Sequence, residues 1–326
     1  VSQGKTKNNK RRQGKTSYRA LKLKNQIKAK KLAKKTNDSN PRTYDLTLFS
    51  NNVHGITSKA STCADIFNKY VIDIACTQES FLTGGENPPP SLCNNKYSHI
   101  KDNRQTQLGG GVLSLYPKVW HSDVVKIASG SNAEFHAIKF NCFSPPLVLI
   151  NYYGPQATRG QDHVLNSIRE VMYEAQIHLV DSTIVLCGDF NLYIGDSILP
   201  GNDPKLSKAG TLFNSLIEEM GLTIMNYMNK DFVHTYVDHQ HNTKRALDLI
   251  ITNNPGAFNS VVIDTHSREG TPSFTPFSTR VTNNDQRKVY ADHAAIIASI
   301  TLPLKQSNSN RSEEHTSELQ SPDHLV

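Results

Sequence analysis

The sequence lacks the features of a disulfide-rich or membrane-spanning protein. Its 326 residues include only five cysteines, an odd number without a Cys-x-x-Cys pair: Cys63, Cys76, Cys93, Cys142 and Cys187. This argues against a disulfide framework or a zinc site and favours a reducing, intracellular setting. No apolar run approaches the roughly 20 residues that span a bilayer. No apolar segment follows the basic N-terminus, as it would in a secretory signal. We therefore expect no membrane partner.

Acidic residues are almost missing from the N-terminal part of the chain. Residues 1–42 hold 15 of the 36 Lys and Arg and one acidic residue, whereas the rest holds 21 basic and 28 acidic residues. With few apolar positions to bury, residues 1–44 are predicted to be a basic arm that is disordered in isolation. Such an arm is either a solvated tail or a segment that contacts nucleic acid or the import machinery. Its charge density favours the second interpretation and a nuclear location.

Residues 45–304 have a different pattern, in which short apolar runs alternate with amphipathic stretches. Val164, Ile168, Val171 and Ala175 recur at three- and four-residue steps, which predicts a helix. Residues 212–220 repeat this spacing before Gly221, a C-cap candidate, and a shorter helix is expected around 66–70. Strands are predicted at 46–49, 71–77, 111–116, 135–140, 147–152, 184–187, 247–251 and 294–300. Strands mixed with helices on this scale predict an α/β layered sandwich.

Residues 305–326 form a tail outside this pattern. Residues 311–321 look like the in-frame translation of a widely used sequencing adapter, so residues 311–326 are a suspected adapter-derived artefact and are excluded from fold reasoning. Resequencing the locus from an independent genomic amplicon tests this interpretation, and codons that persist there would contradict it.

One segment combines a strand with two polar side chains suited to hydrolysis. The sequence CGDFN at 187–191 follows the apolar run 183–186. Asp189 and Asn191 are two residues apart, so they face the same side in extended geometry. A carboxylate that orients a water, beside an amide that holds it, suits hydrolysis. A plain strand-to-turn ending explains the segment equally well when it is taken alone.

Other polar residues also stand at predicted strand ends. The chain has NNVHG at 51–55, Glu79 after the strand 71–77, YYGP at 152–155 and Asp292-His293 before the strand 294–300. A carboxylate at a strand end can hold a hard cation such as Mg²⁺. Asp248 lies inside an apolar strand, where a charge is costly unless it is paired. A histidine is its natural partner.

In chain order, these residues resemble the endonuclease/exonuclease/phosphatase superfamily, the fold of deoxyribonuclease I and of the abasic-site endonucleases. The stretches LFSNNVHGI, QESFL and NYYGP are most similar to the endonuclease domain of non-LTR retrotransposons. The resemblance implies a four-layer α/β sandwich over residues 45–304: two packed, mixed and mostly antiparallel sheets flanked by helices. It also implies an endonuclease that hydrolyses DNA phosphodiester bonds with a divalent metal, Mg²⁺ or Mn²⁺, in target nicking.

The resemblance also implies a role for each residue. Glu79 and Asp292 bind the metal, with Asn52 close by. Asp189 positions and deprotonates the attacking water, and Asn191 holds Asp189 and the phosphate. His293, oriented by Asp248, contacts the scissile phosphate, and Tyr153 donates to a phosphate oxygen. Thr235 is expected to line the DNA groove.

Three positions depart from the family pattern. His54 stands where relatives carry Asp or Asn near the metal, Gln156 where a substrate-contacting Asn is usual, and Ala291 where a small hydroxyl residue precedes the Asp-His pair. His54 is either a metal neighbour or a surface turn residue. Imidazole suits Mg²⁺ poorly, so His54→Asp is expected to raise Mg²⁺-supported activity. An unchanged or lower rate in a metal titration counts against this.

Two alternatives to a DNA endonuclease stay open. The same catalytic set would serve a small-molecule or lipid phosphatase, although the basic arm and the retrotransposon-like stretches favour DNA. A catalytically inactive nucleic-acid-binding relic would explain the departures, although every core position is present. Retrotransposon proteins of this kind carry a reverse transcriptase after the endonuclease, so we expect a truncated polyprotein. Long-read sequencing past the codon for residue 310 would contradict this if it met a natural stop at once.

Overall fold

A computed structural model describes residues 42–93, 95–103, 109–130, 134–156, 160–176, 181–194, 207–227, 234–238, 243–265, 280–281, 288–289 and 292–306. The predictions for the basic arm, apart from residues 42–44, and for residues 311–326 lie outside this part of the chain.

One six-stranded sheet has the order β13-β16-β1-β2-β4-β3. Its strands are β1 (Thr43–Asn52), β2 (Ile74–Gln78), β3 (Tyr97–Asp102), β4 (Val112–Pro117), β13 (Phe258–Asp264) and β16 (Ala295–Pro303). Only β1 and β2 run parallel among these pairs, and the helix between them makes the crossover.

A second six-stranded sheet has the order β5-β6-β7-β8-β12-β9. Its strands are β5 (Val124–Ser129), β6 (Glu134–Phe140), β7 (Leu147–Tyr153), β8 (Thr183–Asp189), β9 (Thr223–Ile224) and β12 (Asp248–Thr252). Here β7 and β8 are the parallel pair. Two short hairpins stand apart from the sheets: β10 (Tyr236–Asp238) with β11 (Thr243–Arg245), and β14 (Arg280–Val281) with β15 (Lys288–Val289).

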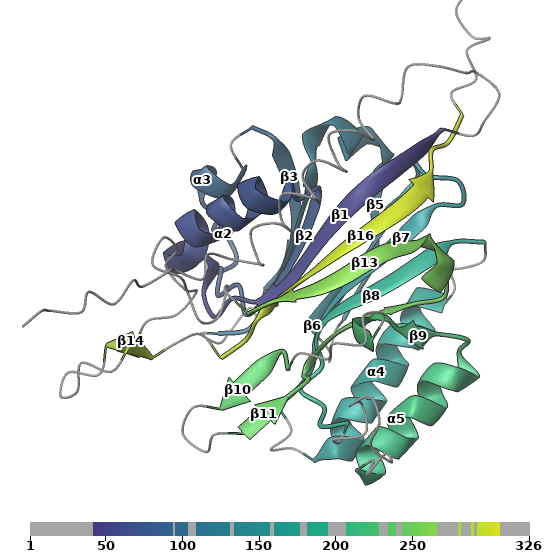
Figure 1. Ribbon diagram of the computed structural model, residues 1–326. Coiled ribbons are helices and arrows are strands. Elements are labelled where there is room, and N and C mark those ends of the chain that lie inside the picture. The colour runs from purple at the N-terminus through teal and green to yellow at the C-terminus, as the bar shows by residue number, and fades with distance from the viewer. Residues whose placement is uncertain are drawn as a thin grey trace, which may run out of the picture. The chain divides into compact units, whose positions relative to one another are not determined.

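Helices flank the two sheets, as Figure 1 shows. The helices α2 (Ile56–Tyr70) and α3 (Pro90–Cys93) lie beside the first sheet, and α4 (Gln161–Gln176) and α5 (Lys208–Glu219) beside the second. Short 3₁₀ helices, η2 (Lys118–Asp123), η4 (Met225–Tyr227) and η5 (Pro255–Ala257), connect strands. Three apolar clusters fill the three interfaces of these four layers. The predicted α/β sandwich of two mixed, mostly antiparallel sheets is confirmed.

The predicted element boundaries differ from the structure at α2 and β2. Helix α2 spans 15 residues and is longer than expected. It ends at Tyr70, because the next residue, Val71, has a left-handed φ of 54° that continues neither a helix nor a strand. The strand predicted at 71–77 therefore begins only at Ile74.

A chain of buried polar side chains runs between the sheets. His136 Nε2 lies 2.7 Å from Ser114 Oγ, which accepts from Asn151 Nδ2 at 3.2 Å. Gln78 Nε2 in turn donates to Asn151 Oδ1 at 2.7 Å. At the other end, His136 Nδ1 lies 3.3 Å from an oxygen of Asp102. Because an unpaired polar group in such a layer is costly, these contacts fix how the two sheets meet.

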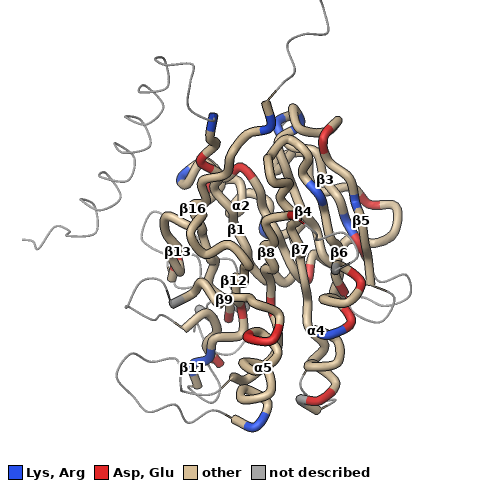
Figure 2. Tube along the Cα trace, turned by 90° about the vertical axis from the view of Figure 1, so that its right-hand side faces the viewer, with Lys and Arg blue, Asp and Glu red and all other residues tan. Residues whose placement is uncertain are grey.

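The described helices include none that is long and apolar enough to cross a membrane. Figure 2 shows acidic and basic residues interspersed along the described chain. A strong attraction for phosphates must therefore come from local groups or from residues 1–41, not from a uniformly basic domain.

Candidate active site

The polar residues singled out in the sequence come from strand ends that meet at one edge of the two sheets. In the second sheet, Tyr153 at the end of β7 pairs with Asp189 at the end of β8, and Asp189 pairs with Asp248 at the start of β12. In the first sheet, Asn52 at the end of β1 pairs with Gln78, which precedes Glu79. The two sheets are joined here by a hydrogen bond from Asn52 Nδ2 to Asp189 Oδ2 at 3.0 Å.

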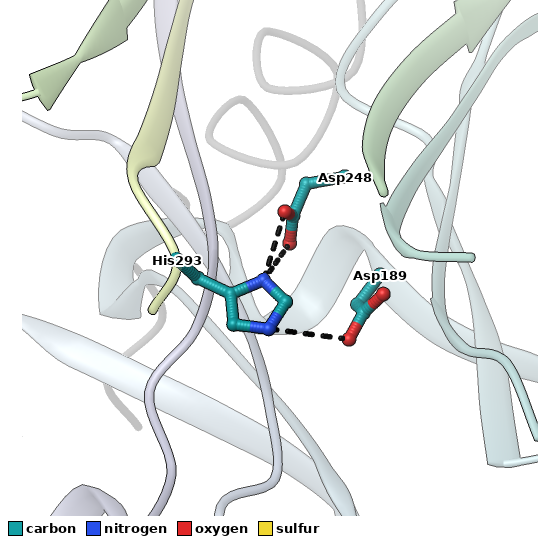
Figure 3. Close-up of side chains that lie close together, drawn as sticks. All are labelled: Asp189, Asp248 and His293. Atoms are coloured by element: carbon teal, nitrogen blue, oxygen red, sulfur yellow. Dashed lines mark hydrogen bonds and ion pairs between the residues drawn. The ribbon is translucent and has the colours of Figure 1, made fainter. Parts of the chain in front are cut away.

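His293 lies between two carboxylates, as Figure 3 shows. Its Nδ1 is 2.9 and 3.1 Å from the two oxygens of Asp248, and its Nε2 is 3.8 Å from Asp189 Oδ2. An antiparallel bridge to Tyr236 holds the backbone of His293, and the Tyr236 ring lies 4.9 Å from the imidazole, centroid to centroid. The imidazole is thus fixed in orientation, with Nε2 directed at Asp189.

Asp248 is fully buried and its strand is held by two polar side chains that carried no strong sequence signal. Thr235 Oγ1 accepts hydrogen bonds from the backbone N–H groups of Leu247 and Asp248, both at 3.0 Å. Asn226 bonds the Asp248 carbonyl and the Ile250 N–H, each at 2.9 Å. The prediction that Thr235 lines the DNA groove is wrong, because its side chain is completely buried under β12.

Glu79 collects three partners on its two carboxylate oxygens. Oε1 accepts from the Tyr153 hydroxyl at 2.6 Å and from Asn52 Nδ2 at 3.1 Å. Oε2 lies 2.7 Å from His54 Nδ1. Asn52 therefore contacts both Glu79 and Asp189 and holds the two carboxylates in one arrangement. The Tyr153 hydroxyl is directed at Glu79, and a phosphate oxygen would have to share it.

The loop after β8 depends on a close backbone approach. A Cβ on Gly188 would lie 1.8 Å from the Tyr152 carbonyl oxygen, so only glycine fits at this point of the β7–β8 pair. Beyond it, Asn191 adopts a left-handed φ of 50°. The Asn191 N–H donates to Asp189 Oδ1 at 2.9 Å, while its side chain donates to the Gly154 carbonyl. Asp189 and Asn191 were expected to be extended, but they form a turn. The hydrogen bond from the Asn191 N–H to Asp189 still connects the two residues.

Backbone strain gathers at this edge. His54, Glu79, Phe81 and Asn191 all have φ between 46° and 55° without being glycine. Such conformations cost on the order of 1–3 kcal/mol each and persist where the surroundings over-determine them. Among the described residues, four of the seven non-glycine residues with positive φ lie in these loops.

The charges of the site are set by burial and by neighbours. Burial raises the pKa of Asp189 to about 7, although His293 and the Asn52 hydrogen bond oppose the shift. Burial would lower the pKa of His293, but the charges of Asp248 and Asp189 outweigh it and raise that pKa to about 10. For Glu79, hydrogen bonds from His54, Tyr153 and Asn52 outweigh burial and lower the pKa to about 2. The site therefore combines an ionised Glu79, a charged imidazolium and an Asp189 that titrates near neutrality.

Ligand atoms for a metal come from the cluster of Asp189, Asp248 and His293 and, separately, from Glu79. Oxygen and nitrogen atoms of Asp189, Asp248 and His293 lie within 4.8 Å of one another. In this group both oxygens of Asp248 already lie 2.9 and 3.1 Å from His293 Nδ1, so fewer uncommitted ligand atoms remain for a cation. Glu79 is ionised and its side chain remains 16% exposed, so its carboxylate fits a hard divalent cation better. Asp292 is exposed, directly before His293.

Two positions that depart from the family pattern lie apart from these contacts or outside the described residues. Gln156 is exposed beyond β7, and Ala291 lies outside the described residues. The three glycines that precede β4, at 109–111, all have positive φ.

The chain is similar to solved structures of nucleases and a phosphatase. An AP endonuclease from Archaeoglobus fulgidus matches with a TM-score of 0.57 and 15% identity, over 78% of this chain and 99% of that chain. The 3′ phosphatase NExo from Neisseria, bound to a product DNA hairpin, matches with a TM-score of 0.54 and 16% identity, over 78% and 99%. The endonuclease domain of TRAS1, a telomere-specific non-LTR retrotransposon, matches with a TM-score of 0.53 and 14% identity, over 79% and 98%.

No family model and no curated protein matches the chain. At these identities the structural similarities show a common fold, which is that of the deoxyribonuclease I-like superfamily predicted from the motifs.

Proposed function

We propose that this chain, which has the deoxyribonuclease I-like fold, is a divalent-metal-dependent endonuclease that hydrolyses DNA phosphodiester bonds. The observation that carries the proposal is the convergence of Asp189, Asp248 and His293 beside Glu79 from separate strands. In-line attack on a phosphodiester needs a base, a positive charge and donors around the phosphate oxygens. These residues offer all three at one edge of the sheets.

Asp189 is assigned as the general base. A base works best when its pKa lies near the working pH, and burial raises the pKa of Asp189 to about 7. The Asn191 N–H and the Asn52 amide hold its two oxygens, so the carboxylate keeps one orientation toward an attacking water. The Asn191 side chain, on the same turn, is assigned to hold the phosphate.

His293 is assigned to the scissile phosphate. The charge of Asp248 keeps the imidazole protonated and its hydrogen bonds fix the ring. A fixed cation stabilises the negative charge that develops on the phosphate oxygens. Tyr153 contributes mainly by orienting Glu79, through the 2.6 Å hydrogen bond.

Glu79 and Asp292 are assigned as metal ligands, with Asn52 close to the ion. When bound, Mg²⁺ or Mn²⁺ supplies Lewis-acid polarisation of the phosphate and stabilises the leaving group. The hydrogen bonds from Asn52 and Tyr153 to Oε1 leave Oε2 facing His54, whose side chain is 63% exposed.

The proposed substrate is DNA, as in target nicking by a non-LTR retrotransposon-type protein. The similarity in fold to the TRAS1 endonuclease domain supports it. The basic residues 1–42 add a segment for DNA or import machinery and motivate a nuclear location. Removal of the arm tests both roles. DNA affinity at several salt concentrations tests the contact with DNA, and microscopy of a tagged chain tests the nuclear location.

The test is nicking of supercoiled plasmid by the full chain with Mg²⁺, with Mn²⁺ and with a chelator. The proposal expects nicking with a metal and none with the chelator, and loss of nicking in Asp189→Asn that is folded by circular dichroism. A folded protein that nicks with neither metal would contradict it.

A phosphatase on the same fold is the second candidate, favoured by the similarity to the Neisseria 3′ phosphatase. Phosphate release from a 3′-phosphorylated oligonucleotide and from inositol phosphates, measured beside plasmid nicking, separates the two. A protein that binds DNA with both activities absent would be the inactive relic.

A further inference from the structure

His54 places a ring nitrogen against the carboxylate proposed to bind the metal. Its Nδ1 lies 2.7 Å from Glu79 Oε2. Ligand atoms at neighbouring corners of a small octahedral ion lie roughly 3 Å apart, as metal–ligand distances of about 2.1 Å require. The two atoms therefore already have nearly the spacing of two ligands on one ion. The His54 side chain is 63% exposed, so an ion from solvent can reach it.

The orientation of the His54 ring is fixed by its surroundings. The residue adopts a left-handed φ of 46°, and its N–H donates to Asn52 Oδ1 at 3.2 Å. The Phe81 ring lies edge-on at 4.9 Å between centroids. The next residue, Gly55, donates its N–H to the Glu79 carbonyl at 2.7 Å. Backbone and ring contacts thus tie the loop of His54 to the loop of Glu79, which is the preorganisation a ligand pair needs.

We propose that His54 Nδ1 and Glu79 Oε2 bind one cation together, and that this nitrogen shifts the site from Mg²⁺ toward first-row transition-metal dications. The inference rests on the proposed function, since it takes Glu79 as the carboxylate ligand. Mg²⁺ prefers oxygen ligands throughout, whereas imidazole favours the transition metals. Metal binding replaces the hydrogen bond between Nδ1 and Oε2, and the neutral ring then carries its single proton on Nε2. Asn52 stays behind Glu79 as the group that orients the carboxylate.

This assignment gives the unusual residue in NNVHG a specific role. An Asn or Asp in its place would offer only oxygen and would keep the preference for Mg²⁺.

The experiment uses the full chain, with Mn²⁺ as the probe because it is paramagnetic. Free and bound Mn²⁺ are separated by electron paramagnetic resonance, and pulsed measurements detect a directly bound ¹⁴N. Mg²⁺ affinity is measured by competition. The variants are His54→Asn, Glu79→Gln and, as a matched control, His163→Asn, which changes an exposed histidine of α4.

Wild type and His163→Asn are expected to show a bound nitrogen that His54→Asn lacks. The Mn²⁺-over-Mg²⁺ preference is expected to fall about tenfold in His54→Asn, the scale on which groups around a metal change affinity. A bound-nitrogen signal that persists in His54→Asn, or that is missing from wild type, overturns the inference, as does an unchanged preference.

Glu79→Gln separates this inference from the proposed function. If Glu79→Gln loses both ions while His54→Asn behaves as wild type, the metal site stands and only the role of His54 fails. If Glu79→Gln binds both ions as wild type does, the metal site is elsewhere and the assignment of Glu79 fails with it.

Discussion

Among the residues that the structure describes, two histidine–aspartate pairs differ in the direction in which the pKa of the histidine is shifted. His293 faces Asp248 and Asp189 at the edge of the sheets, and their charges raise its pKa to about 10. His136 faces Asp102 between the sheets, where burial outweighs the carboxylate and lowers its pKa. Asp102 is also bonded to Lys126, at 2.6 Å, which weakens its hold on the histidine.

The difference teaches that an adjacent carboxylate does not by itself make a histidine catalytic. His136 even lies 2.7 Å from a serine hydroxyl, so Ser114, His136 and Asp102 have the order of a nucleophilic triad. Ser114 and His136 are completely buried, and no substrate can reach them. His293 keeps 13% of its side chain exposed and faces the proposed base. Access and a second carboxylate therefore distinguish the two pairs.

The largest effect is expected from Asp189→Asn. The change keeps the shape of the side chain and removes the proposed base, so nicking should fall by about 10²–10⁴-fold. Quantified plasmid nicking at saturating metal measures it. Metal affinity, measured separately, should stay near wild type, and a variant that nicks normally would contradict the assignment.

A smaller loss of nicking is expected from Asp248→Asn. The ring of His293 loses the charge that holds it protonated, and nicking should fall by about 10²-fold, as when one transition-state donor is lost. Thr235→Val sharpens this result, because Thr235 supports the Asp248 backbone alone. It should lower the free energy of unfolding by about 1–3 kcal/mol through two unsatisfied N–H groups. Equal catalytic defects per folded molecule in both variants would count against a role for the Asp248 charge.

The buried contact between Ser114 and His136 is expected to affect stability and not catalysis. Ser114→Ala removes a hydroxyl that contacts both His136 and Asn151 and should lower the free energy of unfolding by about 1–3 kcal/mol. Urea unfolding measures this loss, and nicking per folded molecule should match wild type. If Ser114→Ala lost nicking activity without losing stability, the purely structural role of Ser114 and His136 would be contradicted.

The smallest expected effect is a pH dependence of stability. The pKa of His136 lies below its ordinary value of 6.5, so the unfolded chain binds this proton more readily and stability falls as pH drops below about 6.5. The pKa of Asp102 is also lowered, because His136 and Lys126 outweigh burial. That contribution is present above about 3.8 and is lost in more acidic solution. Urea midpoints between pH 7.5 and 5 should decline less in His136→Gln than in wild type, and parallel curves would contradict this.

The sequence predicted the central strands because their apolar runs are long and buried, as in β7, where all seven residues are buried. The edge strand β3 was missed because its six residues are all half-buried and show no clear alternation. Strands β5 and β13 were also missed. Their residues mix exposed positions with half-buried or buried ones and likewise lack a regular alternation.

The sequence singled out the polar residues at the strand ends, but it did not predict which of them contact one another. His54 and Glu79 are 25 residues apart and meet only because β1 and β2 pair in parallel. The sequence around Thr235 did not indicate that its side chain is buried against the backbone of Asp248. His136 and Ser114 are polar residues inside apolar runs, which was the available sign of an internal network, but their meeting depends on how the sheets pack.

The most direct measurement compares nicking by His293→Gln and His136→Gln on one plasmid, with rates normalised to the folded fraction. We expect His293→Gln to lose about 10²–10³-fold, the scale of a lost charge-stabilising donor, and His136→Gln to nick as wild type does. Equal rates in the two variants, or full activity in His293→Gln, would contradict the assignment of the active site to the edge where Asp189, Asp248 and His293 meet.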